Sequence, residues 1–217
     1  MQKVLEILAK TLSVVLYPLL LPTYGFVLYA FYGVKAKVAI PSLWRGALGL
    51  ECISGTLIIT AIMPLLVFWL MWKTKRISSL HLDNAAERSE PYIWCIFFFA
   101  VWCFFFSRLY LSAVADYGLY AIMALTIVWV VNHWWKISAH LTGMGCLLGG
   151  VFSFGLLHRL PVTQTTIVVL ILSLLLMYAR LYLRAHTPLQ VVCGFLLGLA
   201  CTLVPNWILL LISHASV

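Results

Sequence analysis

Two arginines and a histidine, Arg180, Arg184 and His186, lie between two long apolar runs. Charged side chains are costly to keep at the edge of a hydrocarbon layer, so a functional role is the first explanation to consider. An arginine at a helix end can instead extend its charge to the headgroups, and for Arg184 alone this explanation is equally good. The case for chemistry therefore depends on other polar segments that reach the same place.

Two further polar segments carry residues of the same kinds. Arg88 lies in the longest polar stretch, and Lys136, Ser138 and His140 lie together between two apolar runs. With the first segment they supply cations, two histidines and a hydroxyl, without the carboxylate cluster that typically holds a metal ion. We interpret the other histidines singly as interfacial residues: His81, His133, His158 and His214.

Cations beside histidines suit chemistry on a phosphate group. A guanidinium group binds phosphate oxygens through two parallel N–H···O bonds and does not readily lose its charge. One imidazole can attack phosphorus as a nucleophile while another protonates the leaving oxygen. The surrounding positive charge stabilises the transition state without a metal. The residue types therefore predict phosphoryl transfer that needs no cofactor.

The composition is that of an integral membrane protein. Of the 217 residues, 64% are hydrophobic and 9% are charged, and the mean hydropathy is +1.06, more than a soluble domain of this size needs. The net charge of +8 comes from cations at the ends of apolar runs and does not indicate nucleic-acid binding. The six cysteines lie inside apolar runs, and we interpret them as small buried side chains.

The apolar runs predict an all-α fold, a polytopic transmembrane helix bundle of six or seven spans that forms one integral membrane domain over residues 1–217. Residues 1–10 carry charges at helical spacing and predict a short interfacial helix. We expect kinks at Pro18 and Pro22 and a turn at residues 116–118. The predicted spans are residues 11–33, 46–72, 91–107, 117–135, 139–157, 163–183 and 188–212.

The number of spans between the polar segments decides whether these segments can meet. Two predicted spans separate Arg88 from His140, and two more separate His140 from His186. An even number of crossings returns the chain to the same side of the membrane, so all three segments are expected at one face. This prediction requires the short run 91–107 to be a complete crossing.

The segments resemble the three signature motifs of the type 2 phosphatidic acid phosphatase (PAP2) superfamily, whose patterns are Lys-x6-Arg-Pro, Pro-Ser-Gly-His and Ser-Arg-x5-His-x3-Asp. Arg180, His186 and Gln190 have the spacing of the third motif, with glutamine in place of the aspartate. Ser138 and His140 have the spacing of the second. The Arg-x5-His element is followed by Thr-Pro and a helix that contains glycine, which makes the resemblance more specific.

The first motif is the least complete. Arg88 has Pro91 nearby, but His81 stands where the motif has its lysine. Lys136, which is close to the second motif, could replace that lysine. The resemblance covers about residues 73–212, which would form the catalytic core.

The resemblance implies a metal-independent phosphatase that hydrolyses a membrane lipid phosphate or diphosphate through a phospho-histidine intermediate. By position, His186 would be the nucleophile and His140 the acid that protonates the leaving group. Arg88, Arg180 and the segment around Ser138 would hold the phosphate oxygens. The expected partners are the lipid bilayer and a lipid phosphate substrate.

Gln190 is the main departure from the family pattern. It lies on the correct helix face to hydrogen-bond the nucleophilic histidine, but it brings no charge, and an amide at the analogous position of a serine-protease triad costs roughly 10⁴ in rate. The enzyme would then be slow, another carboxylate (Asp83, Glu87 or Glu90) would compensate, or activity would be lost. The alternative function is therefore a catalytically weak or inactive PAP2-like protein that binds anionic lipid headgroups.

The side of the membrane that the site faces stays open. Leaving the proposed site aside, Lys3, Lys10, Lys73, Lys75 and Arg76 lie on the site's side, and Lys35, Lys37, Arg45, Arg108 and Arg159 lie on the other. This equal count gives no orientation by the positive-inside rule. Resemblance to bacterial members of the family favours an outward-facing site, while the basic cluster at residues 73–76 favours the opposite. The expected location is the bacterial inner (cytoplasmic) membrane.

Overall fold

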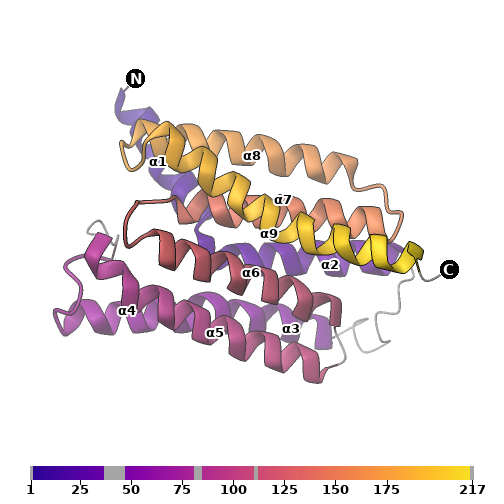
Figure 1. The fold of residues 1–217 in the computed structure, drawn as a ribbon. Coiled ribbons are helices and arrows are strands. Elements are labelled where there is room, and N and C mark those ends of the chain that lie inside the picture. The colour runs from indigo at the N-terminus through magenta and orange to yellow at the C-terminus, as the bar shows by residue number, and fades with distance from the viewer. Residues whose placement is uncertain (1, 37–46, 81–84, 110–111, 216–217) are drawn as a thin grey trace.

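The computed structural model describes residues 2–36, 47–80, 85–109 and 112–215, and every regular element within these ranges is helical. Among the described residues, seven helical stretches are long and apolar enough to cross a membrane. Figure 1 shows the long helices packed side by side, running between two ends of the bundle. The predicted all-α bundle of six or seven spans is confirmed, and the chain is an integral membrane protein.

The elements are, in chain order, α1 (Gln2–Val15), η1 (Pro18–Leu20), α2 (Leu21–Ala36), α3 (Ala47–Leu57), η3 (Ile58–Ile62), α4 (Met63–Lys73), η4 (Ala85–Arg88), α5 (Ser89–Arg108), α6 (Ser112–Val131), α7 (Ala139–Leu157), α8 (Thr163–Tyr182) and α9 (Pro188–Ala215). The predicted spans 139–157 and 163–183 coincide with α7 and α8 to within one residue. Helix α5 has 20 residues, which is about 30 Å and enough to cross the hydrocarbon layer. The short run 91–107 therefore belongs to a complete crossing.

The N-terminal run is divided into two helices. Helix α1 ends at Val15 and α2 begins after the short turn η1, because Pro18 has no N–H with which to continue the α1 ladder. Pro22 lies in the first turn of α2, where a missing N–H costs little, and it produces no break. The Tyr24 hydroxyl donates to the Val15 carbonyl at 2.8 Å and satisfies one open carbonyl at the end of α1.

A π-helical turn, η3, lies in the middle of the second span. Pro64 cannot donate to the carbonyl of Thr60, four residues earlier, so the ladder shifts there and the Met63 N–H donates to the Ile58 carbonyl. The Thr60 hydroxyl lies 3.3 Å from the Leu19 carbonyl in η1. The widened turn thus brings the second span into contact with the N-terminal segment.

The turn predicted at residues 116–118 is wrong, because these residues lie within α6. Gly118 serves helix packing instead. A Cβ atom at Gly118 would collide with Cys103 and Trp102 of α5, so the two helices approach closely at this position.

Helices α7 and α9 begin at the same end of the bundle and run side by side in the same direction (Figure 1). A Cβ atom added at Gly145 of α7 would collide with the backbone of Phe195, and one added at Gly198 of α9 would collide with the backbone of Thr142. The contact is therefore made by main chain against main chain, as small residues allow between membrane helices.

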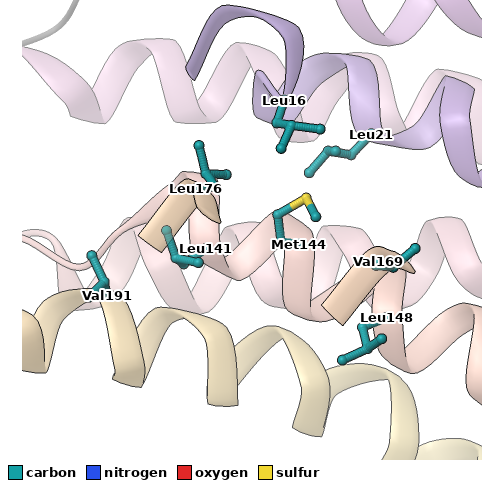
Figure 2. Close-up of a cluster of buried hydrophobic side chains, with 8 residues drawn as sticks. All are labelled: Leu16, Leu21, Leu141, Met144, Leu148, Val169, Leu176 and Val191. Carbon is teal, nitrogen blue, oxygen red and sulfur yellow. The ribbon is translucent and has the colours of Figure 1, made fainter. Parts of the chain in front are cut away.

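A buried apolar cluster surrounds the first half of α7. Figure 2 shows its eight side chains: Leu16, Leu21, Leu141, Met144, Leu148, Val169, Leu176 and Val191. They come from α1, α2, α7, α8 and α9 or the segments next to them. Leu141 and Met144 are completely buried at the centre. The cluster packs together the beginnings of α7 and α9 and the second half of α8, near which His140, His186 and Arg180 lie.

Candidate functional site

The three predicted segments lie at one end of the bundle. Arg88 directly precedes α5, Ser138 directly precedes α7, and His186 lies shortly before α9. Figure 1 shows the beginnings of these helices at the same end, opposite the C terminus. The even number of crossings between the segments, with α5 counted as complete, accounts for this placement.

His186 is held by the first turn of α9. Its Nδ1 atom lies 3.2 Å from Gln190 Oε1, and the same oxygen accepts a hydrogen bond from the Thr187 N–H at 3.0 Å. The Gln190 N–H donates in turn to the Thr187 hydroxyl at 3.4 Å. This reciprocal pair is a capping box, and Pro188 occupies the first helical position as such a box favours. Gln190 therefore serves both the helix and the histidine.

The shared oxygen determines the tautomer of His186. A backbone N–H can only donate, so the amide of Gln190 must turn its oxygen, and not its NH₂ group, toward Thr187. Since that oxygen also faces the ring, Nδ1 of His186 carries the proton and Nε2 keeps its lone pair. This is the tautomer that a nucleophile attacking through Nε2 requires.

Arg184 ends α8 and turns the chain toward His186. Its φ angle of 51° lies in the left-handed region. The N–H groups of Ala185 and Arg184 donate to the carbonyls of Arg180 and Leu181 at 3.1 and 2.9 Å. These two bonds form a Schellman motif, in which glycine is the usual residue at the left-handed position. Arg184 thus has a structural role, and its charge suits the negative end of the helix dipole.

The charges that act on His186 are positive. Burial lowers the pKa of His186 most, and Arg180, Lys136 and Arg88 lower it further, to about 4, against a smaller opposing effect of the Gln190 hydrogen bond. The three cations predicted from separate segments thus act on one imidazole. At pH 7 the ring is neutral, which is the form that can attack phosphorus.

His140 lies in the first turn of α7, beside α1. Its Nε2 atom lies 3.2 Å from the Ser13 carbonyl oxygen, and because that oxygen accepts, Nε2 carries a proton. This carbonyl is one of those that the end of α1 leaves without a helical partner. The ring also meets Tyr17 edge-on, with centroids 5.4 Å apart. His140 interacts electrostatically with Arg180 and His186, so the two histidines belong to one site.

Ser138 connects α7 to α9. Its completely buried hydroxyl accepts from the Leu141 N–H at 3.5 Å and caps α7. Its own N–H donates to the Gln190 carbonyl at 3.3 Å, and a Cβ atom at Gly194 would come within 2.7 Å of its carbonyl. The second and third segments are therefore in direct backbone contact. Since the hydroxyl serves the cap, the N–H groups of the first turn of α7 are the better ligands for an anion.

Arg88 is held by a residue that the sequence did not single out. It is 7% exposed, and its Nη1 donates to Asn132 Oδ1 at 3.3 Å, just beyond the end of α6. A polar residue directly after an apolar run was the available signal for Asn132. Thr187 was also readable, because Thr-x-x-Gln before an apolar run is a capping-box pattern. The Ser13 carbonyl left no signal, because every residue has a carbonyl.

Two carboxylates that could have compensated for the missing aspartate have partners elsewhere. Glu87 accepts hydrogen bonds from the Ser78 N–H at 2.6 Å and from its hydroxyl at 2.8 Å. Glu90 forms an ion pair with Arg76 at 2.8 Å. Outside the described residues lie the third carboxylate and the first-motif histidine, Asp83 and His81. In the part of the chain that the structure describes, Gln190 is the group that orients His186.

Two other histidines contact the ends of their own helices. His133 Nδ1 lies 2.9 Å from the Trp129 carbonyl at the end of α6. His158 caps α7 at the opposite end of the bundle, and its ring packs on Phe154 with centroids 4.6 Å apart. The side chain of His214 lies outside the described residues.

Comparisons of the chain with protein-family models, with curated proteins and with solved structures gave no match. The resemblance to the PAP2 superfamily therefore stays a prediction from short motifs. The structure itself shows two interacting histidines, His140 and His186, with the charges of Arg180, Lys136 and Arg88 acting on His186.

Proposed function

We propose that this protein is a metal-independent membrane phosphatase that hydrolyses a lipid phosphate or diphosphate through a phospho-histidine on His186. The observation that carries the proposal is the state of His186. Its ring is neutral at pH 7, its Nδ1–H is bound to Gln190, and three cations act on it. A neutral imidazole that keeps its Nε2 lone pair, with the positive charges of three cations acting on it, suits attack on a phosphate.

In the first step Nε2 of His186 forms a bond to phosphorus while the bond from phosphorus to the lipid oxygen breaks. The proton that a monoanionic phosphate group carries passes to His140 and from there to the leaving oxygen. With Nε2 of His140 bound to the Ser13 carbonyl, the nitrogen that serves the substrate is Nδ1. In the second step water attacks phosphorus, His140 takes a proton from this water, and the phosphorus–nitrogen bond breaks to release phosphate.

Arg88, Lys136 and Arg180 supply the positive charge that the transferring phosphoryl group needs. Arginine is suited to grip two oxygens at once. Arg88 is buried and held by Asn132, so its guanidinium group is positioned before substrate arrives.

We expect Gln190 to lower the reactivity of His186 less than an amide lowers the reactivity of the histidine in a protease triad. The triad loses roughly 10⁴ in rate because the amide selects the wrong tautomer. Here the Thr187 N–H holds the amide oxygen toward His186, so the correct tautomer is retained. What is missing is the negative charge that would stabilise the phosphorylated, cationic ring. We therefore expect a slow enzyme rather than an inactive one.

The test is phosphate release in detergent from phosphatidic acid, phosphatidylglycerol phosphate and isoprenyl diphosphates, with a chelator present throughout. His186→Ala should abolish release, and His133→Ala, a histidine at the same end, should not. Acid-labile phosphate trapped on the wild-type protein should map to His186. No turnover with any of these lipids, together with unchanged behaviour of His186→Ala, would overturn the proposal.

A second candidate is a catalytically weak or inactive protein that binds anionic headgroups. One observation favours it: His140 and Gln190 both serve helix ends, at Ser13 and Thr187, so each has a structural reason to be present. Under this alternative, binding to phosphatidic acid vesicles depends on Arg88 and Arg180, while no phosphate is released. Vesicle binding and release measured on the same samples distinguish the two functions.

We also propose the bacterial inner membrane as the location, on the basis of the motif resemblance alone. Labelling of a cysteine introduced at the exposed Trp134, at the site's end of the bundle, with a membrane-impermeant reagent in intact cells reports the side that the site faces. Labelling only after the membrane is opened would place the site on the cytoplasmic side.

A further inference from the structure

A narrow apolar cavity of about 150 Å³ lies among α2, α5, α6 and α7. Along α7 its lining extends from Ala139 to Phe154, which corresponds to about 22 Å of helix. A volume of this size, spread over such a length, is a slot rather than a rounded chamber. Figure 1 shows the four helices running together along this length.

One end of the cavity lies at the candidate site. Ala139 is the residue between Ser138 and His140. Pro18, another lining residue, follows Tyr17, whose ring contacts His140. The cavity therefore begins beside the imidazole that we assign as the acid, and it continues away from the site toward the far end of the bundle.

The walls offer hydrocarbon rather than hydrogen bonds. Thr142 and Thr202 line the cavity, but their hydroxyls donate to helix carbonyls at Ser138 and Gly198. The Tyr117 hydroxyl differs, because it is buried and has no hydrogen-bond partner among the described residues. A lining that is mostly hydrocarbon does not hold a file of water molecules, since each water needs polar partners.

We propose that this cavity binds a single hydrocarbon chain of the lipid whose phosphate is held at His186. This proposal rests on the proposed function, because it takes the headgroup position from the phosphatase site. A chain that leaves the bilayer for the cavity gains little hydrophobic energy, since both environments are apolar. The cavity therefore acts by positioning the phosphate and by selecting chains of suitable length and number.

The first test does not depend on catalysis. A phosphate monoester of one hydrocarbon chain carries a diazirine about 15 Å from the phosphorus, level with Gly150, which lies ten residues beyond His140 on α7. Photolysis should label cavity residues of α2, α6 and α7 equally in the wild-type protein and in His186→Ala. Labelling confined to the lipid-exposed face of α8, such as Leu170 and Leu174, would overturn the proposal.

The second test fills the cavity. A Cβ atom at Gly150 makes only ordinary contacts with Tyr117, at 3.5 Å, so Gly150→Leu should extend into the slot. It should lower kcat/KM for a long-chain phosphate by about tenfold and leave a chain too short to reach Gly150 unaffected. Gly55→Leu is the control, because nothing lies within 4 Å of its Cβ position. An equal loss for both chain lengths would contradict chain binding.

Tyr117→Phe tests the polarity of the occupant. It should leave long-chain turnover and photolabelling unchanged, because a hydrocarbon does not need the hydroxyl. A large loss in Tyr117→Phe together with a normal Gly150→Leu would indicate a polar occupant and overturn the proposal. Failure of the proposed function is distinct from all of these results: no phosphate would be released from either chain length, while photolabelling would still decide whether the chain binds.

Discussion

The turn between α7 and α8 and the turn between α8 and α9 are built alike. Each follows a helix that ends in a Schellman motif, and each places an arginine, Arg159 or Arg184, at a φ angle of 51°. Each also contains a histidine and a proline. In both turns burial lowers the pKa of the histidine, His158 or His186.

The difference between the two turns lies in what surrounds the histidine. His158 packs on Phe154 of its own helix, and burial is the cause of its lowered pKa. His186 meets Gln190 of the next helix, and the charges of cations from three segments act on it. The comparison teaches that the turn itself does not make a site. The site arises where an even number of crossings brings other polar segments to the same end.

The largest expected effect separates the two histidines. His186→Ala should reduce phosphate release by at least about 10⁴, because it removes the proposed nucleophile, while His158→Ala should leave the rate unchanged. Both are measured with the same lipid phosphate in detergent. A comparable loss in His158→Ala would show that the change acts through folding, and equal rates in all three proteins would remove His186 from the mechanism.

Substitutions of Arg180 and Arg159 should differ in their effect on turnover, as those of the two histidines do. Arg180→Gln should lower kcat/KM by roughly 10²–10³, because it removes positive charge from the transferring group. Arg159→Gln, at the exposed end of the other turn, should have no effect on turnover. Inhibition by inorganic phosphate, measured on both variants, should weaken only in Arg180→Gln. If Arg159→Gln lost as much activity, the loss in Arg180→Gln would come from the change in net charge and not from the position of Arg180 at the candidate site.

A carboxylate at position 190 should change the pH profile. Gln190→Glu keeps the capping box and adds a negative charge beside His186, which stabilises the protonated ring and raises its pKa. The acid limb of kcat/KM should therefore move from near pH 4 toward 6.5. The rate at pH 7 should rise by about tenfold, because the cationic phospho-histidine is stabilised.

Gln164→Glu, in the first turn of α8, is the matched control for this change and should keep the acid limb of the wild type. If the acid limb of the kcat/KM pH profile did not move in Gln190→Glu, the ionisation of His186 would not control the rate.

The smallest effect should be common to both turns. Arg184→Gly and Arg159→Gly relieve a left-handed conformation that side chains disfavour, so each should stabilise the fold by about 0.5 kcal/mol. Thermal unfolding in the same detergent measures both. If Arg184→Gly alone lowered the unfolding temperature, the Arg184 side chain of the wild type would make contacts at the site whose stabilisation outweighs the backbone strain.

Much of the architecture could be predicted from apolar run length. The runs at 139–157 and 163–183 match their helices closely because each is bounded by polar residues that cannot stay in hydrocarbon. The common end of Arg88, His140 and His186 followed from counting crossings. The turn at 116–118 was predicted wrongly because glycine marks close helix packing as well as chain reversal.

The details of the site were less accessible. The spacing of His186 and Gln190 predicted their hydrogen bond, which the structure contains. It did not reveal that Thr187 fixes the orientation of the amide, although the capping-box pattern was present. The bond from His140 to the Ser13 carbonyl joins residues that are 127 positions apart. No property of the Ser13 side chain indicates this bond, because the acceptor is the main chain.

The glycine contacts between α7 and α9 determine how firmly the two imidazoles are spaced. Where the main chain of one helix rests directly on that of the other, at Gly145 and Gly198, no rotamer is available to take up movement. The spacing of α7 and α9, at whose beginnings His140 and His186 lie, is then set by van der Waals radii of the backbone. Bilayer thickness, temperature or substitutions in the surrounding helices can rearrange side chains elsewhere in the bundle without changing that spacing.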